Sequence, residues 1–176
     1  MRVMEEDASS SLKTINNWTQ NCDMKTSVVL SLYGIMIYVF FTNSYTACFV
    51  KKWISITKHI KLSNLNYAYF CIFIIFIIIS ALSVCMFFGS LIPRIDLKYE
   101  SIFFFGSIAR NRTFETYENK VIGYNEEKVL NDILKQNYAA AKICDKKFKF
   151  YKIGLILFGV GLALFLLCAI IQPAII

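Results

Sequence analysis

Three long stretches of the chain carry no charged side chain, and charged segments separate them. The stretches cover residues 27–50, 67–92 and 153–172. A helix that crosses the hydrocarbon core of a bilayer needs about 20 mostly apolar residues. Inside lipid, the backbone polar groups must be hydrogen-bonded within the spanning segment, which favours helices. The pattern therefore predicts an all-α membrane protein with about three transmembrane helices.

The remaining residues form a tail at 1–26, a basic loop at 51–66 and a longer segment at 93–152. These hold 3, 4 and 12 of the 19 lysines and arginines, respectively. With three spans, the tail and the 93–152 segment lie on the same side and share 15 of the 19. Because basic residues accumulate on the cytoplasmic side, we expect a cytosolic N-terminus. The loop at 51–66 then faces outward. Its four lysines are an exception to the accumulation of basic residues on the cytoplasmic side.

The second half of the 93–152 segment has a helical pattern that continues into the third span. Asn125 is suited to cap a helix that begins with two glutamates. One helix is predicted from about 126 to 171, with a length of about 70 Å. Steps of three and four along it place apolar or small residues on one stripe. The stripe contains Leu130, Ile133, Leu134, Tyr138, Ala141, Cys144 and Phe148.

The tail has a similar stripe, which indicates that the first membrane helix begins in the cytosol. Its members are Leu12, Ile15, Trp18 and Cys22. Inward extensions of the first and last helices, together with the rest of 93–152, then make a small helical cytosolic layer, in which 93–152 is the candidate ligand-sensing segment. Apolar stripes on such helices need partners, from each other or from neighbouring protomers. We therefore expect a homo-oligomer.

Composition agrees with a membrane protein. Hydrophobic residues make up 57% of the 176 positions, against 45–50% in typical soluble domains. The net charge of +7 is explained by basic residues that flank the spans and meet anionic lipid. The six cysteines form no C-x-x-C pair and there is one histidine, so we predict no metal site and no cofactor.

No enzyme signature is present in the sequence. The chain lacks a Walker-type phosphate loop, an H-E-x-x-H helix and a G-x-S-x-G turn. Its acidic residues alternate with lysines, as on the solvated face of a helix. The sequence therefore predicts a protein that is not an enzyme.

Several groups of the 93–152 segment and the tail are suited to an anionic, aromatic ligand. Arginine matches phosphate, and aromatic rings stack on a base. Positive charge comes from Arg94, Arg110, Arg112, Lys142, Lys146 and Lys147; rings come from Trp18, Tyr117 and Tyr138; amides come from Asn111, Gln136 and Asn137. The ordinary alternative is that these basic and aromatic residues set topology and anchor the helices in lipid. Spacing alone favours this alternative.

Four blocks of sequence carry a more specific signal. They read NNWTQNCDMKTSVVLSLYG, SALSVCMFFGSLIPRI, IFFFGSIARNRTFETY and DILKQNYAAAKICDKKFKFYKIG, in this order along the chain. Together they resemble the small transmembrane effectors, of the PycTM type, in the Pycsar effector family of bacterial antiphage defence. The basic loop at 51–66 departs from that pattern, because its outward-facing connection would be unusually basic.

The resemblance implies a function that spacing could not supply. Such an effector senses cyclic CMP or cyclic UMP from a partner pyrimidine cyclase and impairs the inner membrane, so that the infected cell dies before phage matures. It binds no nucleic acid polymer. Positions that match the family's motifs are Asp23, Lys25, Pro93, Phe105, Gly106, Ile108, Tyr117, Gln136, Tyr138, Lys142, Lys147 and Phe148.

Motif matches and charge together define the candidate site. The candidate ligand-binding residues are Asp23, Lys25, Arg94, Gly106, Ser107, Arg110, Arg112, Tyr117, Gln136, Lys142 and Lys147. At 101–117 we expect a turn and a helix start, with phenylalanines packed inward. Backbone N–H groups of Gly106 and Ser107 would then approach a phosphate, with Arg110 or Arg112 completing the charge.

The expected mechanism is association of protomers that the messenger favours. Small residues allow close helix contact in lipid, and those of the third span are Gly154, Gly159, Gly161 and Ala163. Three other functions stay open. They are an effector gated by another defence nucleotide, a ligand-independent pore of the holin kind, and a structural subunit of a larger membrane complex.

Overall fold

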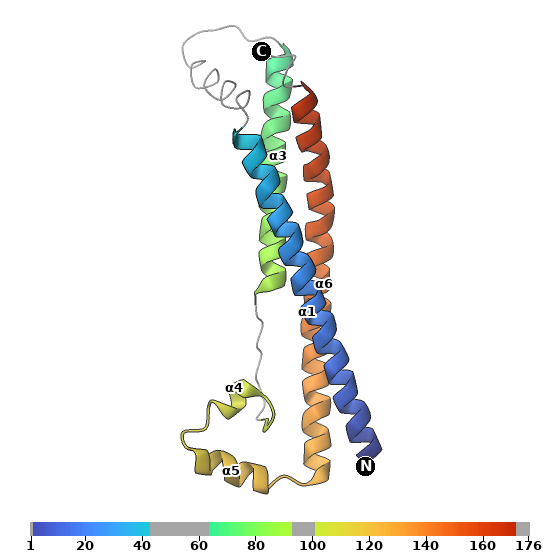
Figure 1. Cartoon of the computed structure of the whole chain (residues 1–176), viewed down its shortest axis with the longest axis vertical. Helices are drawn as coiled ribbons and strands as arrows, with labels where there is room; N and C mark the ends of the chain where they lie inside the picture. The colour runs from blue at the N-terminus through green and yellow to red at the C-terminus, as the bar shows by residue number, and fades with distance from the viewer. Residues whose placement is uncertain (1, 43–63, 93–100, 172–176) are drawn as a thin grey trace. The chain divides into compact units, whose positions relative to one another are not determined.

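The computed structural model describes residues 2–42, 64–92 and 101–171 (Figure 1). These residues form helices α1 (Arg2–Thr42), α3 (Asn64–Leu91), α4 (Phe105–Ile108), α5 (Phe114–Ile122) and α6 (Glu126–Ile171). The described ranges contain no strand. This confirms the all-α class.

Three of the helices, α1, α3 and α6, are long and apolar enough to cross a membrane. The prediction of three transmembrane helices is confirmed in this sense. Helix α3 covers residues 67–91 of the second predicted span. Residues 43–50 of the first predicted span, most of the basic loop, Pro93 and Arg94 lie outside the described residues.

Helix α6 begins and ends where the sequence predicts. Asn125 Oδ1 accepts a hydrogen bond from the Lys128 backbone N–H at 3.0 Å, which is the bond of an N-cap residue. Glu126 and Glu127 occupy the first turn, where negative charge suits the helix dipole. The helix contains no proline, so its hydrogen-bond ladder continues to Ile171.

The chain divides into two compact units. The first, here called the polar unit, contains Met1–Asp23 and Ile92–Phe148; the second, here called the membrane unit, contains Met24–Leu91 and Lys149–Ile176. Helices α1 and α6 contribute to both units, α3 belongs to the membrane unit, and α4 and α5 belong to the polar unit.

In the membrane unit, α3 buries one residue at alternating steps of four and three. Its buried positions are Tyr69, Phe73, Phe76, Ser80, Ser83, Phe87 and Ser90. Such steps average 3.5 residues, the repeat of left-handed coiled-coil packing. An aromatic cluster fills one part of this core: the Phe40 ring lies 5.7 Å from Phe73, 5.1 Å from Phe76 and 5.6 Å from Phe165. Many large apolar side chains of this unit point outward, as contact with lipid requires.

In the polar unit, the buried stripe differs from the predicted one. Leu134 and Tyr138 are exposed, and so is Trp18, with 60% of its surface accessible. Half-buried Asn137 and buried Lys147 lie on the buried stripe of α6 instead. The prediction followed apolar residues, whereas the burial follows a 3.5-residue repeat that also takes in polar positions.

The segment at 101–124 is a turn followed by two short helices. Ser101 and Ile102 are buried, whereas Phe103 and Phe105 are exposed. The expectation that the phenylalanines pack inward is therefore wrong for these two. The turn and the helix start are present, since α4 begins at Phe105. Thr113 caps α5 by accepting a hydrogen bond from the Thr116 N–H at 3.3 Å.

Candidate functional site

A carboxylate of α6 holds the turn that precedes α4. Asp132 is 4% exposed, and its Oδ2 accepts hydrogen bonds from Ser101 Oγ at 3.0 Å and from the Ile102 N–H at 3.1 Å. Ser101 Oγ in turn accepts from the N–H groups of Phe103 and Phe104, both at 3.1 Å. The carboxylate and the Ser101 hydroxyl together satisfy the backbone N–H groups of residues 102–104.

Two of the predicted site residues join this arrangement. Gln136 Nε2 donates to Ser101 Oγ at 3.0 Å and lies 3.4 Å from Asp132 Oδ1. The Tyr117 hydroxyl donates to the Ile102 carbonyl at 3.2 Å. We call Ser101, Ile102, Tyr117, Asp132 and Gln136 the Asp132 cluster. It attaches the α4–α5 segment to α6.

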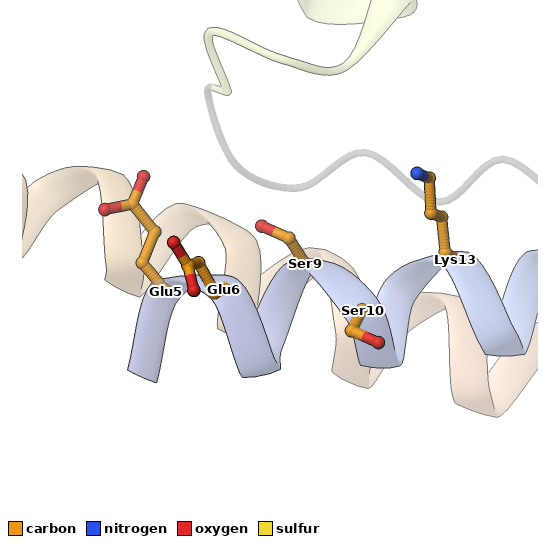
Figure 2. Close-up of a pocket in the computed structure, with 5 residues that line it drawn as sticks. All are labelled: Glu5, Glu6, Ser9, Ser10 and Lys13. Carbon is orange, nitrogen blue, oxygen red and sulfur yellow. The ribbon is translucent and has the colours of Figure 1, made fainter. Parts of the chain in front are cut away.

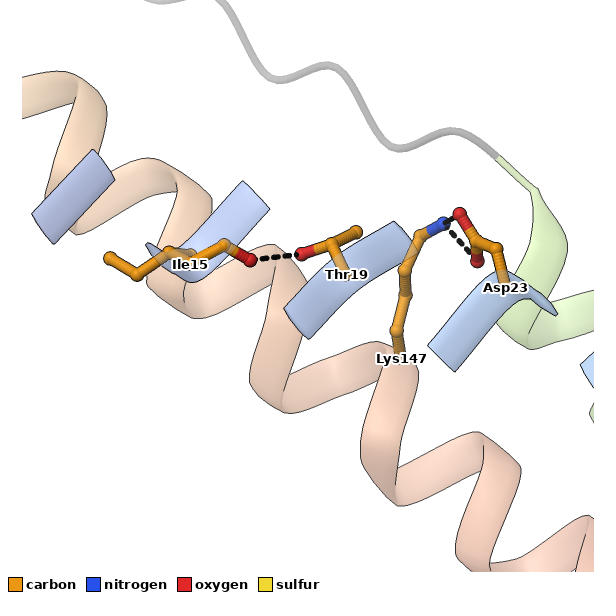
Figure 3. Close-up of polar contacts among 4 residues, drawn as sticks. All are labelled: Ile15, Thr19, Asp23 and Lys147. Atoms are coloured by element: carbon orange, nitrogen blue, oxygen red, sulfur yellow. Dashed lines mark hydrogen bonds and ion pairs between the residues drawn. The ribbon is translucent and has the colours of Figure 1, made fainter. Parts of the chain in front are cut away.

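An ion pair joins α1 to α6 in the polar unit (Figure 3). Lys147 Nζ lies 2.6 Å from Asp23 Oδ1 and 2.7 Å from Asp23 Oδ2. The lysine side chain is 8% exposed and the aspartate side chain 36%. One turn away, the Thr19 hydroxyl donates to the Ile15 carbonyl within α1 at 2.9 Å. Two predicted ligand-binding residues therefore neutralise each other.

A second polar contact links the same two helices. Asn137 Nδ2 donates to the Ala8 carbonyl at 2.8 Å, and among the described residues its buried Oδ1 has no hydrogen-bond partner. Ala8 pairs with Asn137 and Asp23 with Lys147, so α1 and α6 run in the same direction through the polar unit. Buried polar contacts of this kind fix the register between packed helices.

The Asp23–Lys147 pair should show strong coupling in a double-mutant cycle. Asp23→Ala leaves a buried ammonium without its carboxylate and is expected to reduce stability by about 3 kcal/mol. Lys147→Met should lose less stability, because the remaining Asp23 carboxylate is half-exposed and can be hydrated by water. Adding Lys147→Met to Asp23→Ala should restore much of the loss. Melting in detergent measures all four proteins, and additive losses would contradict the pairing.

The other described candidates join neither the Asp132 cluster nor the ion pair, and most of them are exposed. Arg110 and Arg112 are exposed between α4 and α5, and Lys142 Nζ lies 4.6 Å from the centroid of the exposed Tyr138 ring. The Ser107 N–H donates to the Phe104 carbonyl at 3.0 Å, so this donor is already used within α4. Gly106 also lies in α4. Lys25 is exposed in the membrane unit, and Arg94 lies outside the described residues.

A shallow hollow on α1 is a poor match for an anionic ligand. It is lined by Glu5, Glu6, Ser9, Ser10 and Lys13, all from this one helix (Figure 2). Two carboxylates and one ammonium leave the lining with a net negative charge. Among the described residues, no group of His, Cys, Asp and Glu could hold a metal ion.

The three glycines of α6 have different surroundings in the membrane unit. A Cβ added at Gly154 would lie 2.9 Å from the Phe87 ring, and one at Gly161 would lie 3.0 Å from Tyr33 Oη. A Cβ at Gly159 would meet nothing within 4 Å in the described part of the chain. Gly154 and Gly161 therefore serve packing within the chain, whereas Gly159 lies on an open face.

Sequence reasoning missed Ser101 and Asp132 as polar anchors. Both are buried, and their pairing across 31 positions leaves no local pattern. A usable signal was the position of Asp132 directly before Ile133, which places a carboxylate beside the buried stripe of α6. Asn137, one of the amides predicted to suit an aromatic ligand, uses its Nδ2 to hold α1.

Comparison with known proteins identifies the chain's family. The family model described as "Pycsar effector protein domain" matches residues 7–172. The "Pycsar effector protein GmPycTM" of Gulbenkiania mobilis is 31% identical over 166 residues, an alignment that covers 86% of this chain and 84% of the relative. No solved structure matches the chain. With three helices long and apolar enough to cross a membrane, the chain belongs to the Pycsar effector family and is a multi-pass membrane effector of Pycsar antiviral defence.

Proposed function

We propose that this effector senses cyclic CMP or cyclic UMP made by a partner pyrimidine cyclase and then impairs the inner membrane, which kills the infected cell. The match of the Pycsar effector model to residues 7–172 carries the proposal. The named relative, also a Pycsar effector, supports it over most of both chains. In this reading the N-terminus and the polar unit lie in the cytosol, where the messenger is made.

The ligand site that the geometry supports best lies on the polar unit. A cyclic pyrimidine nucleotide carries one phosphate anion and one flat base. Arg110 and Arg112 are exposed, and neither guanidinium makes an ion pair within the described ranges. Arginine is suited to phosphate because it donates two parallel hydrogen bonds. In contrast, Lys147 is already neutralised by Asp23.

The base needs a flat surface, and α6 offers one. The Tyr138 ring is exposed and has Lys142 Nζ above it. Gln136 lies half-buried two residues before Tyr138. We propose that Tyr138 stacks on the pyrimidine and that the two arginines hold the phosphate.

The proposed residues lie on an open surface of one protomer. A second protomer could enclose the nucleotide, and the messenger would then favour association. A ligand shifts an equilibrium only as far as it binds one state better than the other. Sensing would in this way be coupled to the assembly of a homo-oligomer in the membrane.

The first experiment is the melting of the detergent-purified protein with cyclic CMP, cyclic UMP, cyclic AMP, cyclic GMP and several cyclic dinucleotides. A ligand at 100 times its dissociation constant adds about 2.7 kcal/mol to the stability of the native state. We expect a higher melting temperature with one cyclic pyrimidine. A shift with a cyclic dinucleotide alone would instead indicate another defence nucleotide. No shift, with cells still killed by expression alone, would indicate a ligand-independent pore.

The double variant Arg110→Ala/Arg112→Ala tests the phosphate site. We expect it to lose the messenger-induced shift while melting like the wild type without nucleotide, because both side chains are exposed. Lys13→Ala is the matched control, since it removes one exposed cation from α1. A full shift in the double variant would place the phosphate elsewhere.

A further inference from the structure

The inner face of α3 becomes rich in hydroxyl groups toward one end. Of its last four buried positions, three are serines, Ser80, Ser83 and Ser90, and the fourth is Phe87. Alanine would fill almost the same space without carrying a polar group into the membrane unit. Serine is also common where membrane helices pack closely, so the hydrogen bonding of these hydroxyls decides whether the face has a role beyond packing.

Two of the buried hydroxyls in this region make no hydrogen bond of good geometry among the described residues, although they lie close to each other and to Ser83; they are unpartnered in this sense. They are Tyr33 Oη, on a residue that is 1% exposed, and Ser80 Oγ, on a residue that is 7% exposed. Both lie around Gly161, where an added Cβ would be 3.0 Å from Tyr33 Oη and 3.9 Å from Ser80 Oγ. Ser83 Oγ donates to the Gly154 carbonyl at 3.0 Å. We call Tyr33, Ser80 and Ser83 the hydroxyl cluster.

Hydroxyls on the outer face of the membrane unit behave differently. Ser31 is exposed, and its hydroxyl donates to the Ser27 carbonyl one turn back, at 3.0 Å. Thr42 does the same with the Tyr38 carbonyl at 2.8 Å. Such bonds hide a hydroxyl from lipid at little cost. Tyr33 and Ser80 have no such bond, although no bulk water is available inside a bilayer.

We propose that the hydroxyl cluster is where water enters the membrane unit on activation, and that the serine face of α3 then lines an aqueous path for small inorganic ions. Hydration supplies the partners that Tyr33 and Ser80 lack, so it favours a rearranged state over the resting one. Uncharged hydroxyls give weak selectivity between cations and anions. This inference rests on the proposed impairment of the membrane and names the residues that carry it out.

In the resting state, the aromatic cluster of Phe40, Phe73, Phe76 and Phe165 keeps water out of the core. Apolar constrictions close channels by excluding water. The dry, ring-filled part of the core therefore blocks the path until the helices of the membrane unit repack. Activation must therefore displace these rings and also let water reach the serines of α3.

The double variant Tyr33→Phe/Ser80→Ala removes both unpartnered hydroxyls with almost no change in shape. In potassium-loaded liposomes with messenger on both sides, we expect its potassium release to be at least tenfold slower than that of the wild type. Its melting temperature should be higher, because the resting state loses two unpaired polar groups. Ser31→Ala, which removes a hydroxyl from the outer face, should release potassium like the wild type.

Labelling gives a second measurement that a packing role would not affect. A water-soluble methanethiosulfonate reacts with thiols that water reaches, because the thiolate is the reactive form. In a chain without its native cysteines, Ser80→Cys should be labelled at least tenfold faster with messenger than without. A chain that keeps only Cys85, which is exposed on the same helix, should stay unlabelled in both conditions.

Melting of the same protein with and without messenger separates the proposed function from the proposed aqueous path, because it reports nucleotide binding independently of leakage. If messenger binds and potassium leaks, but Ser80→Cys stays unlabelled and the double variant leaks like the wild type, the aqueous path is wrong and the proposed function stands. If no nucleotide binds, the proposed function fails. In that case, liposomes can be made leaky by a high density of protein alone, and Ser80→Cys should be labelled in them. If Ser80→Cys stays unlabelled there, the proposed aqueous path is wrong. A protein that never permeabilises liposomes would overturn both.

Discussion

Asp132→Ala should destabilise the polar unit by about 3 kcal/mol, since a hydrogen bond to a charged group contributes about 1.5–3 kcal/mol. The carboxylate accepts from Ser101 Oγ and from the Ile102 N–H, and all three groups are on buried residues. Its removal leaves the backbone donor without a partner in a place that water does not reach. Melting in detergent measures the global loss, and limited proteolysis between 101 and 124 measures release of the α4–α5 segment.

Two further variants make this test specific. Asp132→Asn keeps an oxygen that can accept the same bonds, so it should lose only about 1 kcal/mol, as for a neutral hydrogen bond. Glu118→Ala removes an exposed carboxylate from α5 and should melt like the wild type. If Asp132→Ala melts and resists protease like Glu118→Ala, the cluster does not hold the segment. We also expect Asp132→Ala to lose the messenger-induced shift, because the segment carries Arg110 and Arg112.

Leucine substitutions at Gly154 and Gly159 should have different effects: the first should lower stability, and the second should block toxicity. Gly154→Leu forces a side chain against the Phe87 ring, which lies 2.9 Å from an added Cβ. Overpacking of this kind typically costs about 1–3 kcal/mol, so the melting temperature should fall. Gly159 is open to its surroundings, and Gly159→Leu should melt like the wild type.

Gly159→Leu should reduce the toxicity of the protein rather than its stability. Small residues let helices of different protomers approach closely in lipid, and leucine at an open position would keep them apart. We expect cells that express Gly159→Leu with the cyclase to survive, while the purified variant keeps its messenger-induced shift. Normal killing by this variant would remove the outer face of α6 from the contact between protomers.

The polar contacts of the polar unit have a common role in both sets of predictions. Asp23 with Lys147 and Ala8 with Asn137 set the register of α1 against α6, and the Asp132 cluster attaches α4 and α5 to α6. Each contact is specific in a way that apolar packing is not, because a shift by one residue would leave buried polar groups unpaired. A messenger that moves the α4–α5 segment therefore has defined contacts to act on.

The sequence by itself determined the three long helices of this protein. Long uncharged stretches predicted the three membrane helices, and Asn125 followed by two glutamates predicted the start of α6, which the structure places at Glu126. These features are local. A span depends on the hydropathy of consecutive residues, and a helix start depends on a side chain that reaches an N–H three residues away. The four sequence blocks likewise pointed to the family, which the comparisons confirm.

Only the tertiary structure decided which side of each helix is inside. Apolar spacing placed Trp18 and Tyr138 on the inner stripes, yet both are exposed, while Asn137 and Lys147 are turned toward α1. Likewise, no local rule separates Gly159 from Gly154 and Gly161, or pairs Ser101 with Asp132. Burial depends on the partner that lies opposite. The partners are 31, 124 or 129 positions apart along the chain. A contact over such a separation produces no periodic pattern in the sequence of either segment, so it cannot be predicted from local spacing.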